Sequence, residues 1–170
     1  MSGNSLDMVI GAGSAIGHAL IERWSREGSR PVLAVARSEA SLAAVDALGV
    51  QTQHCDYSEA ALATFAAQLQ ERSADVTRLV ICNGVLQGEG YRPERALNQL
   101  TTSAMQQVFE VNTFLPMRVL ASLAPVLKRS EAPRIAVLSA RVGSIGDNGL
   151  GGWYSYRGSK AALNMMLRCA

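Results

Sequence analysis

The sequence predicts an α/β fold with a doubly wound parallel sheet. Five short segments, most of them apolar, alternate with longer segments whose apolar residues recur at helical spacing. Strands that are apolar throughout are typical of parallel sheets covered by helices on both faces. Right-handed crossovers between such strands then predict the strand order 3-2-1-4-5. The chain has 170 residues and shows no internal repeat, charge block or linker, so we expect one domain over residues 1–170.

Strands are expected where β-branched and other apolar residues run together. In chain order they cover residues 6–10, 31–36, 50–54, 79–82 and 135–138. Helices are expected over residues 15–27, 39–48, 58–73, 102–129 and 154–170. The longest of these contains Pro116, which has no N–H, so the carbonyl of Asn112 loses its helical hydrogen bond. That carbonyl is then free to hold a water molecule; the alternative is that Pro116 only kinks the helix.

Composition excludes several classes of protein. With 48% apolar and 18% charged residues, the chain differs from disordered polymers. A net charge of +2 without a basic run argues against a nucleic-acid partner. No apolar stretch approaches the roughly 20 residues that cross a bilayer, so we expect no membrane partner.

The cysteines and the N-terminus favour a cytoplasmic location. Cys55, Cys82 and Cys169 are scattered and odd in number, which is typical of a reducing compartment. Residues 1–7 lack the basic and apolar regions of a secretory signal. His18 and His54 fall in separate segments, so no metal site is expected.

A glycine-rich turn follows the first expected strand. Glycines allow a tight turn and the approach of a pyrophosphate, while the next helix offers N–H donors and the positive end of its dipole. The turn therefore predicts a dinucleotide site. Its cofactor-binding residues are Gly11, Gly13, Ser14, Ala15, Ile16 and Gly17.

Two residues after later strands indicate the type of dinucleotide. Arg37 ends the second strand, where an acidic residue would bind the ribose 2′-hydroxyl of NAD. A guanidinium suits a 2′-phosphate, so NADP(H) is expected in preference to NAD(H). Asp56 ends the third strand and is expected to accept a hydrogen bond from the adenine amino group.

Tyr156 and Lys160 lie four residues apart and share one face of the last expected helix. An ammonium beside a phenol stabilises the phenolate, which makes a proton donor and acceptor near neutral pH. The pair therefore predicts acid–base chemistry at this helix.

Taken in order, these motifs resemble the short-chain dehydrogenase/reductase family over the whole chain. The matching pieces are residues 11–17, Asp56, residues 81–84, Asn112 and residues 156–160, which correspond to the family's T-G-x-x-x-G-x-G, acidic, N-N-A-G, asparagine and Y-x-A-S-K motifs. Residues 139–156 are most similar to the C-factor-like branch, named for a developmental signalling protein. The resemblance implies a Rossmann-type fold.

The same resemblance implies roles for individual residues. Tyr156 would be the general acid, Lys160 would bind the nicotinamide ribose and tune Tyr156, and Asn112 would anchor a water in the proton relay. Asn83 and Gly84 would line the cofactor cleft.

The sequence departs from the family pattern in four places. Ala15 replaces a glycine of the turn, and residues 81–84 keep only part of N-N-A-G. Ala140 stands where the carbonyl-orienting serine usually lies, so either Ser139, which we prefer, or Ser144 takes its role. Family members continue beyond the point matching Ala170, so we expect a truncated chain without the family's C-terminal strands, in which the fifth strand is an exposed edge.

We therefore expect an NADP(H)-dependent oxidoreductase that interconverts a small-molecule carbonyl and an alcohol. The alternative is a cofactor-binding, C-factor-like signalling or regulatory protein with little or no catalysis. A homodimer or homotetramer is expected through the helices at 102–129 and 154–170, as the family resemblance implies. Both carry many apolar residues, including Val108, Val111, Leu115, Val119, Leu120, Leu123, Val126, Leu127, Ala161, Ala162, Leu163, Met165, Met166 and Leu167.

Overall fold

A five-stranded parallel sheet organises the first of two compact units in the computed structural model, which describes residues 4–170. This unit comprises the described residues up to Cys82 together with Arg118–Val137. The strand order is β3-β2-β1-β4-β5, which confirms the predicted 3-2-1-4-5. The strands are Ser5–Ile10 (β1), Val32–Ala36 (β2), Gln51–His54 (β3), Asp75–Ile81 (β4) and Arg134–Val137 (β5).

Burial differs between the strands of the sheet. β2 is buried throughout and β1 nearly so, whereas β4, which also has a neighbour on each side, is only partly buried. β3 and β5 lie at the edges and are mostly exposed, so the expectation of strands apolar throughout fails at β3, whose sequence is Gln-Thr-Gln-His. An edge strand tolerates polar side chains because water reaches it.

The fourth strand begins at Asp75 and not at residue 79 as predicted. Its first half contains the polar residues Asp75, Thr77 and Arg78, so a search for apolar runs does not detect it. Backbone pairing with β1 extends the strand nonetheless, with Asp7 opposite Arg78 and a register shift between Leu6 and Asp7.

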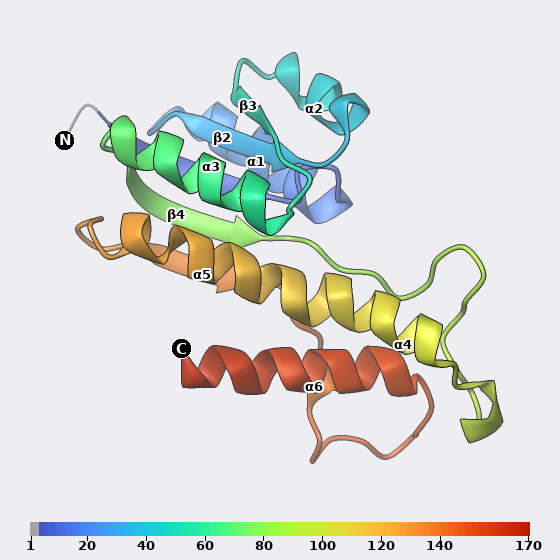
Figure 1. Cartoon of the computed structure of the whole chain (residues 1–170). Coiled ribbons are helices and arrows are strands. Elements are labelled where there is room, and N and C mark those ends of the chain that lie inside the picture. The colour runs from blue at the N-terminus through green and yellow to red at the C-terminus, as the bar shows by residue number, and fades with distance from the viewer. Residues whose placement is uncertain (1–3) are drawn as a thin grey trace. The chain divides into compact units, whose positions relative to one another are not determined.

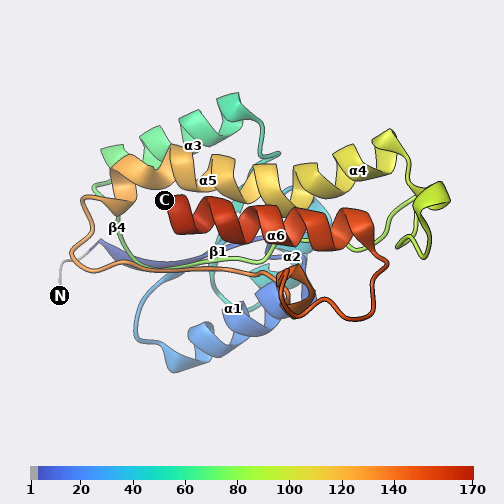
Figure 2. The same ribbon diagram turned by 90° about the horizontal axis from the view of Figure 1, so that it is seen from below.

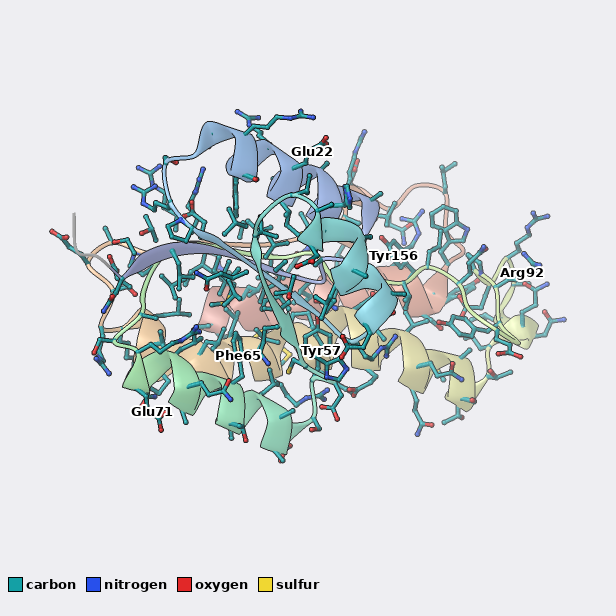
Figure 3. All side chains as sticks on the ribbon, turned by 90° about the horizontal axis from the view of Figure 1, so that it is seen from above. Glu22, Tyr57, Phe65, Glu71, Arg92 and Tyr156 are labelled. Atoms are coloured by element: carbon teal, nitrogen blue, oxygen red, sulfur yellow. The ribbon has the colours of Figure 1, made fainter. Side chains whose placement is uncertain are left out.

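Helices cover both faces of this sheet (Figure 2). Helix α1 (Ala15–Glu27) lies on one face (Figure 2), and α2 (Glu39–Asp46) packs against β2, β3 and α1. Helix α3 (Glu59–Glu71) and the part of α5 (Leu115–Leu127) that belongs to this unit lie on the other (Figure 2). Phe65 of α3 is 2% exposed and points into the interior, whereas Glu71 lies on the surface (Figure 3).

The predicted helix over residues 102–129 is divided into three parts. Helix α4 (Thr102–Phe109) passes into a π-helical segment, Glu110–Phe114, before α5 begins. In that segment the Leu115 N–H donates to the Glu110 carbonyl, five residues earlier. Pro116 lacks a donor and its ring crowds the preceding turn, and a π-bulge absorbs both effects.

The second unit comprises Asn83–Met117 and Leu138–Ala170. Its main elements are α4 and α6 (Tyr154–Cys169), which lie side by side (Figure 1). Two short 3₁₀ turns, Leu97–Gln99 (η1) and Arg141–Gly143 (η3), complete it, and η3 packs on α6. The expectation of a single domain stays a prediction. Within residues 4–170, no helix is long and apolar enough to cross a membrane, and no group of His, Cys, Asp and Glu side chains is arranged to hold a metal.

Candidate active site

The glycine-rich turn between β1 and α1, in the first unit, is shaped by close backbone approaches. Gly11 has a left-handed φ of 84°, which favours glycine, and the N–H groups of Gly11 and Ala12 donate to the Val35 carbonyl at 2.9 and 3.0 Å. A Cβ at Gly17 would lie 2.5 Å from the Gly11 carbonyl oxygen, so a larger residue would have to displace backbone. Glycine is therefore required at both ends of the turn.

Two further residues leave this turn open to an anion. A Cβ at Gly13 would lie 2.4 Å from the Ser41 hydroxyl oxygen, so glycine keeps the chain close to α2. Ser14 caps α1 by accepting a hydrogen bond from the Gly17 N–H at 2.9 Å. The first N–H groups of α1, from Ala15 and Ile16, have no carbonyl one turn earlier within the helix. This donor set and the positive end of the helix dipole fit a pyrophosphate.

Arg37 and Asp56 lie in the same unit, each just beyond the carboxyl end of its strand. The Arg37 side chain is exposed and its carbonyl lies 3.0 Å from Nε2 of His54. The Asp56 carboxylate accepts from the Ser58 N–H at 2.8 Å, and the Ser58 hydrogen bonds hold the pKa of Asp56 below its ordinary value. The carboxylate is exposed, so it keeps acceptor capacity for an amino group.

Tyr57 is a residue of this unit that the sequence reasoning missed. It is 3% exposed, has a left-handed φ of 65°, and its hydroxyl donates to the Val35 carbonyl at 3.2 Å. That carbonyl also receives the two N–H groups of the glycine turn. Tyr57 therefore braces the strand end on which the turn depends. No local pattern indicates this, because its partner lies 22 residues away.

Tyr156 and Lys160 occupy successive turns of α6 in the second unit. Lys160 is 3% exposed, and its Nζ donates to the Leu138 carbonyl at 2.8 Å. Burial lowers the pKa of this ammonium group. Tyr156 is half-buried, and its carbonyl accepts from the Ser159 hydroxyl at 2.8 Å.

Asn112 joins three parts of the second unit. Its Oδ1 accepts from the Val85 N–H at 2.7 Å, and its Nδ2 donates to the Val85 carbonyl at 2.9 Å and to the Ser159 hydroxyl at 3.0 Å. A Cβ at Gly84 would lie 3.6 Å from both the Asn112 Oδ1 and the Lys160 Nζ. The structure thus brings Gly84, Asn112 and Lys160 together around the loop that follows β4.

Asn83 precedes this loop. Its side-chain Oδ1 is buried, and within residues 4–170 it has no hydrogen-bond partner. A buried acceptor without a donor is costly. A bound group that donates a hydrogen bond would remove that cost, so the predicted cofactor-binding role of Asn83 fits its surroundings.

The two candidate serines have different neighbours on α6. The Ser139 hydroxyl donates to Oδ1 of Asn164 at 2.6 Å, and Asn164 is one helical turn beyond Lys160. Ser144 lines a cavity of about 360 Å³ together with other loop residues and with Tyr154, Arg157, Gly158 and Ala161 of α6. A Cβ at Gly143, next to Ser144, would lie 2.8 Å from the Lys160 Cβ, so the segments of both serines approach Lys160, and the preference for Ser139 stays a prediction.

The predicted site residues thus form two groups. The first unit holds Gly11, Gly13, Ser14, Ala15, Ile16, Gly17, Arg37 and Asp56. The second holds Asn83, Gly84, Asn112, Ser139, Tyr156 and Lys160. Figure 3 labels Tyr156 on α6.

Comparison with known proteins gives one family. A family model described as short chain dehydrogenase matches residues 7–170. The 1-hydroxy-2-glutathionyl-2-methyl-3-butene dehydrogenase of Rhodococcus sp. strain AD45 is 30% identical over 159 residues, covering 94% of this chain and 66% of that protein. C-signal of Myxococcus xanthus is 40% identical over 73 residues, covering 43% of this chain and 44% of that protein. The chain therefore spans less than two thirds of the length of these curated relatives.

Solved structures agree with this result. A short-chain dehydrogenase/reductase of Burkholderia multivorans with bound NADP has a TM-score of 0.80 at 25% identity, covering 98% of this chain and 71% of that one. A short-chain dehydrogenase of Pseudomonas syringae has a TM-score of 0.83 at 25% identity, covering 97% of this chain and 67% of that one.

Proposed function

Because this chain belongs to the short-chain dehydrogenase family, we propose that it carries the cofactor-binding and proton-transfer residues of an NADP(H)-dependent oxidoreductase that interconverts a carbonyl and an alcohol. The observation that carries the proposal is the pair on α6, where a buried Lys160 ammonium lies one turn from Tyr156. A lysine at 3% exposure is costly to keep charged, and such groups cluster at functional sites.

The protein residues supply proton transfer and orientation. When bound, NADPH supplies the hydride. Tyr156 donates its phenolic proton to the carbonyl oxygen and takes it back when the alcohol is oxidised. Lys160 stabilises the phenolate that Tyr156 forms, and Ser139 orients the carbonyl by a hydrogen bond, with Ser144 as the alternative. The Asn112 carbonyl holds the water that returns a proton to Tyr156.

The first unit supports NADP(H) over NAD(H). Arg37 is exposed directly after β2, and no carboxylate precedes Glu39 in this loop. Ser41 of α2 lies against Gly13 of the glycine turn, which adds a hydroxyl donor on the same side of the sheet. A guanidinium with neighbouring hydroxyls suits a phosphate, whereas an acidic residue would suit a 2′-hydroxyl.

The test is the absorbance of NADPH during incubation with a panel of aldehydes and ketones. We expect turnover by the parent chain and a loss of roughly 10²-fold or more in kcat for Tyr156→Phe, which removes the proton donor. Tyr91→Phe is the control, because Tyr91 lies in a loop and not on α6. Equal rates for the parent and Tyr156→Phe would contradict the proposal.

A second candidate is a cofactor-binding signalling protein with little catalysis. The similarity to C-signal and the presence of Ala140 at the usual serine position favour it. Losing one such donor costs about 10²–10³ in rate in other enzymes. NADPH binding measured by fluorescence, without turnover of any carbonyl in the panel, would favour this candidate over the first.

We further propose a cytoplasmic setting and self-association through α6. The three cysteines support the first, since Cys55 and Cys82 are buried as free thiols. Met165 and Met166, which are 62% and 39% exposed, support the second.

A further inference from the structure

Helix α6 begins with an unusual run of backbone. Gly151, Gly152 and Trp153 have left-handed φ values of 66°, 67° and 53°. Glycine adopts this conformation freely, but a tryptophan does so only when its surroundings hold it there. Trp153 is also the N-cap residue of α6, and its side chain makes no capping hydrogen bond.

Glu94, in the loop between β4 and α4, holds this run from outside the helix. Its carbonyl accepts from the Trp153 N–H at 2.6 Å. Its carboxylate accepts from the Ser155 N–H at 3.3 Å and from the Ser155 hydroxyl. Gly152 packs against the same residue, since a Cβ there would lie 3.2 Å from the Glu94 carbonyl oxygen.

The burial of Glu94 makes this arrangement specific. The residue is 4% exposed, and an isolated carboxylate at that depth would be strongly disfavoured. The first turn of a helix offers unpaired N–H groups and a positive dipole end, which stabilise a carboxylate. Glu94 therefore replaces the cap that Trp153 cannot supply.

The hydrogen bonds by which Glu94 holds Trp153 and Ser155, here called the clamp, end one residue before Tyr156. The Trp153 ring lies edge-on to the Tyr156 ring, with centroids 6.3 Å apart and an interplanar angle of 77°. A change in the backbone at 151–155 would therefore move the Trp153 ring and the first turn of α6, which carries Tyr156. We propose that Glu94 is a positioning residue, whose clamp on Trp153 and Ser155 sets the orientation of Tyr156 for proton transfer. This inference rests on the proposed function for the role of Tyr156.

A spectroscopic experiment tests the clamp without reference to activity. In a Trp24→Phe background, Trp153 is the sole tryptophan, because the chain has two. We expect Glu94→Ala to change the near-ultraviolet circular dichroism and the emission of Trp153 while the far-ultraviolet spectrum is retained. The matched control is Glu89→Ala, which removes an exposed carboxylate from the same loop and should leave both signals unchanged.

Graded variants keep the test decisive if Glu94→Ala does not fold. Glu94→Gln retains an oxygen for the Ser155 N–H, and Ser155→Ala removes only the hydroxyl bond, so both should give intermediate signals. A Trp153 signal that is the same in the parent, in Glu94→Gln and in Ser155→Ala would overturn the clamp.

Turnover then tests the positioning role. A misplacement of about 1 Å costs roughly 100-fold in rate, so we expect kcat of Glu94→Ala to fall by about that factor with little change in KM. The pH at which alcohol oxidation reaches half its maximal rate should also rise, because a displaced tyrosine loses the support of Lys160. A merely structural role would lower the folded fraction and leave this pH unchanged. An unchanged pH dependence in a folded Glu94→Ala would overturn the inference. A parent without turnover would count against the proposed function, and the Trp153 spectra would then be the test of the clamp.

Discussion

Arg37 of the first unit and Lys160 of the second are cationic residues with opposite surroundings. The Arg37 side chain is exposed after β2, where solvent screens its charge until an anion binds. Lys160 is buried in α6, and its Nζ is held by the Leu138 carbonyl. The first is suited to recognition of a phosphate, and the second to stabilising a neighbouring phenolate, since burial strengthens electrostatic interactions.

Arg37→Ala should weaken NADPH binding and leave NADH binding unchanged. A hydrogen bond to a charged group contributes about 1.5–3 kcal/mol, which corresponds to roughly a 10- to 100-fold rise in the Kd for NADPH. Fluorescence titration with both nucleotides measures this difference. Arg72→Ala, an exposed arginine at the end of α3, is the control. Equal weakening of NADPH and NADH binding would contradict the NADP(H) preference.

Lys160 should make the free energy of unfolding depend on alkaline pH. Burial lowers its pKa in the folded chain below the ordinary value of 10.5, so the cost of the buried charge is fully present below the lowered pKa. That cost is relieved as pH rises from the lowered pKa towards 10.5, because the folded chain loses the proton first.

Urea unfolding of the parent and of Lys160→Met across this range measures the effect. The parent should gain stability relative to the variant as pH increases. Lys128→Met is the matched control, because Lys128 is exposed, and its difference from the parent should stay constant. A constant difference for Lys160→Met as well would refute the prediction.

The pairing of elements β1 and β4 includes a buried ion pair. Asp7 is 0% exposed and lies opposite Arg78 in the strand register. The Arg78 guanidinium donates to the Asp7 carboxylate at 2.5 Å and to the Glu27 carboxylate of α1 at 3.2 Å, and lies 4.3 Å from the centroid of the Trp24 ring. One side chain of β4 therefore joins β1 and α1.

Removing Arg78 should destabilise this unit far more than removing a surface arginine. Arg78→Ala leaves the Asp7 charge buried without a partner, which costs about 3–5 kcal/mol. Arg23→Ala removes the exposed pair between Arg23 and Glu27 on α1, which contributes little to stability because solvent screens both charges. Urea unfolding of both variants at neutral pH compares them. Equal losses would show that the pair between Asp7 and Arg78 is not the dominant link.

At the scale of the whole molecule, the chain builds two units by passing between them three times, after Cys82, Met117 and Val137. The predicted apolar stripe of the long helix is largely buried within the chain, with Val108, Val119 and Leu123 at 1% exposure or less. The side chains of this stripe therefore pack against other residues of the same chain. Met165 and Met166 near the end of α6 remain exposed, and such apolar side chains favour association.

We expect the chain to self-associate weakly through the end of α6. Light scattering over a concentration series should show a mass that rises with concentration. Met165→Gln combined with Met166→Gln should lower that rise, while Ile145→Gln, which changes a residue 85% exposed in a loop, should not. A monomer mass at every concentration would exclude this mode of association.

The sequence by itself determined the features that depend on neighbouring residues. The strand order follows from alternating strands and helices joined by right-handed crossovers. The glycine turn could be recognised because Gly17 closely approaches the backbone of Gly11, only six residues earlier in the chain. Tyr156 and Lys160 could be paired because a helix places residues four apart on one face.

Only the tertiary structure decided the features that depend on contacts between distant residues. Strand β4 begins before the predicted residue 79 because it includes Arg78, whose charge is paired with the buried carboxylate of Asp7 in β1. An apolar pattern assigns such a charged residue to a loop. Tyr57 braces a carbonyl 22 residues away, and Glu94 caps a helix that begins 60 residues later. A side chain's burial and its hydrogen-bond partner depend on how the chain packs, and spacing along the sequence carries no record of either.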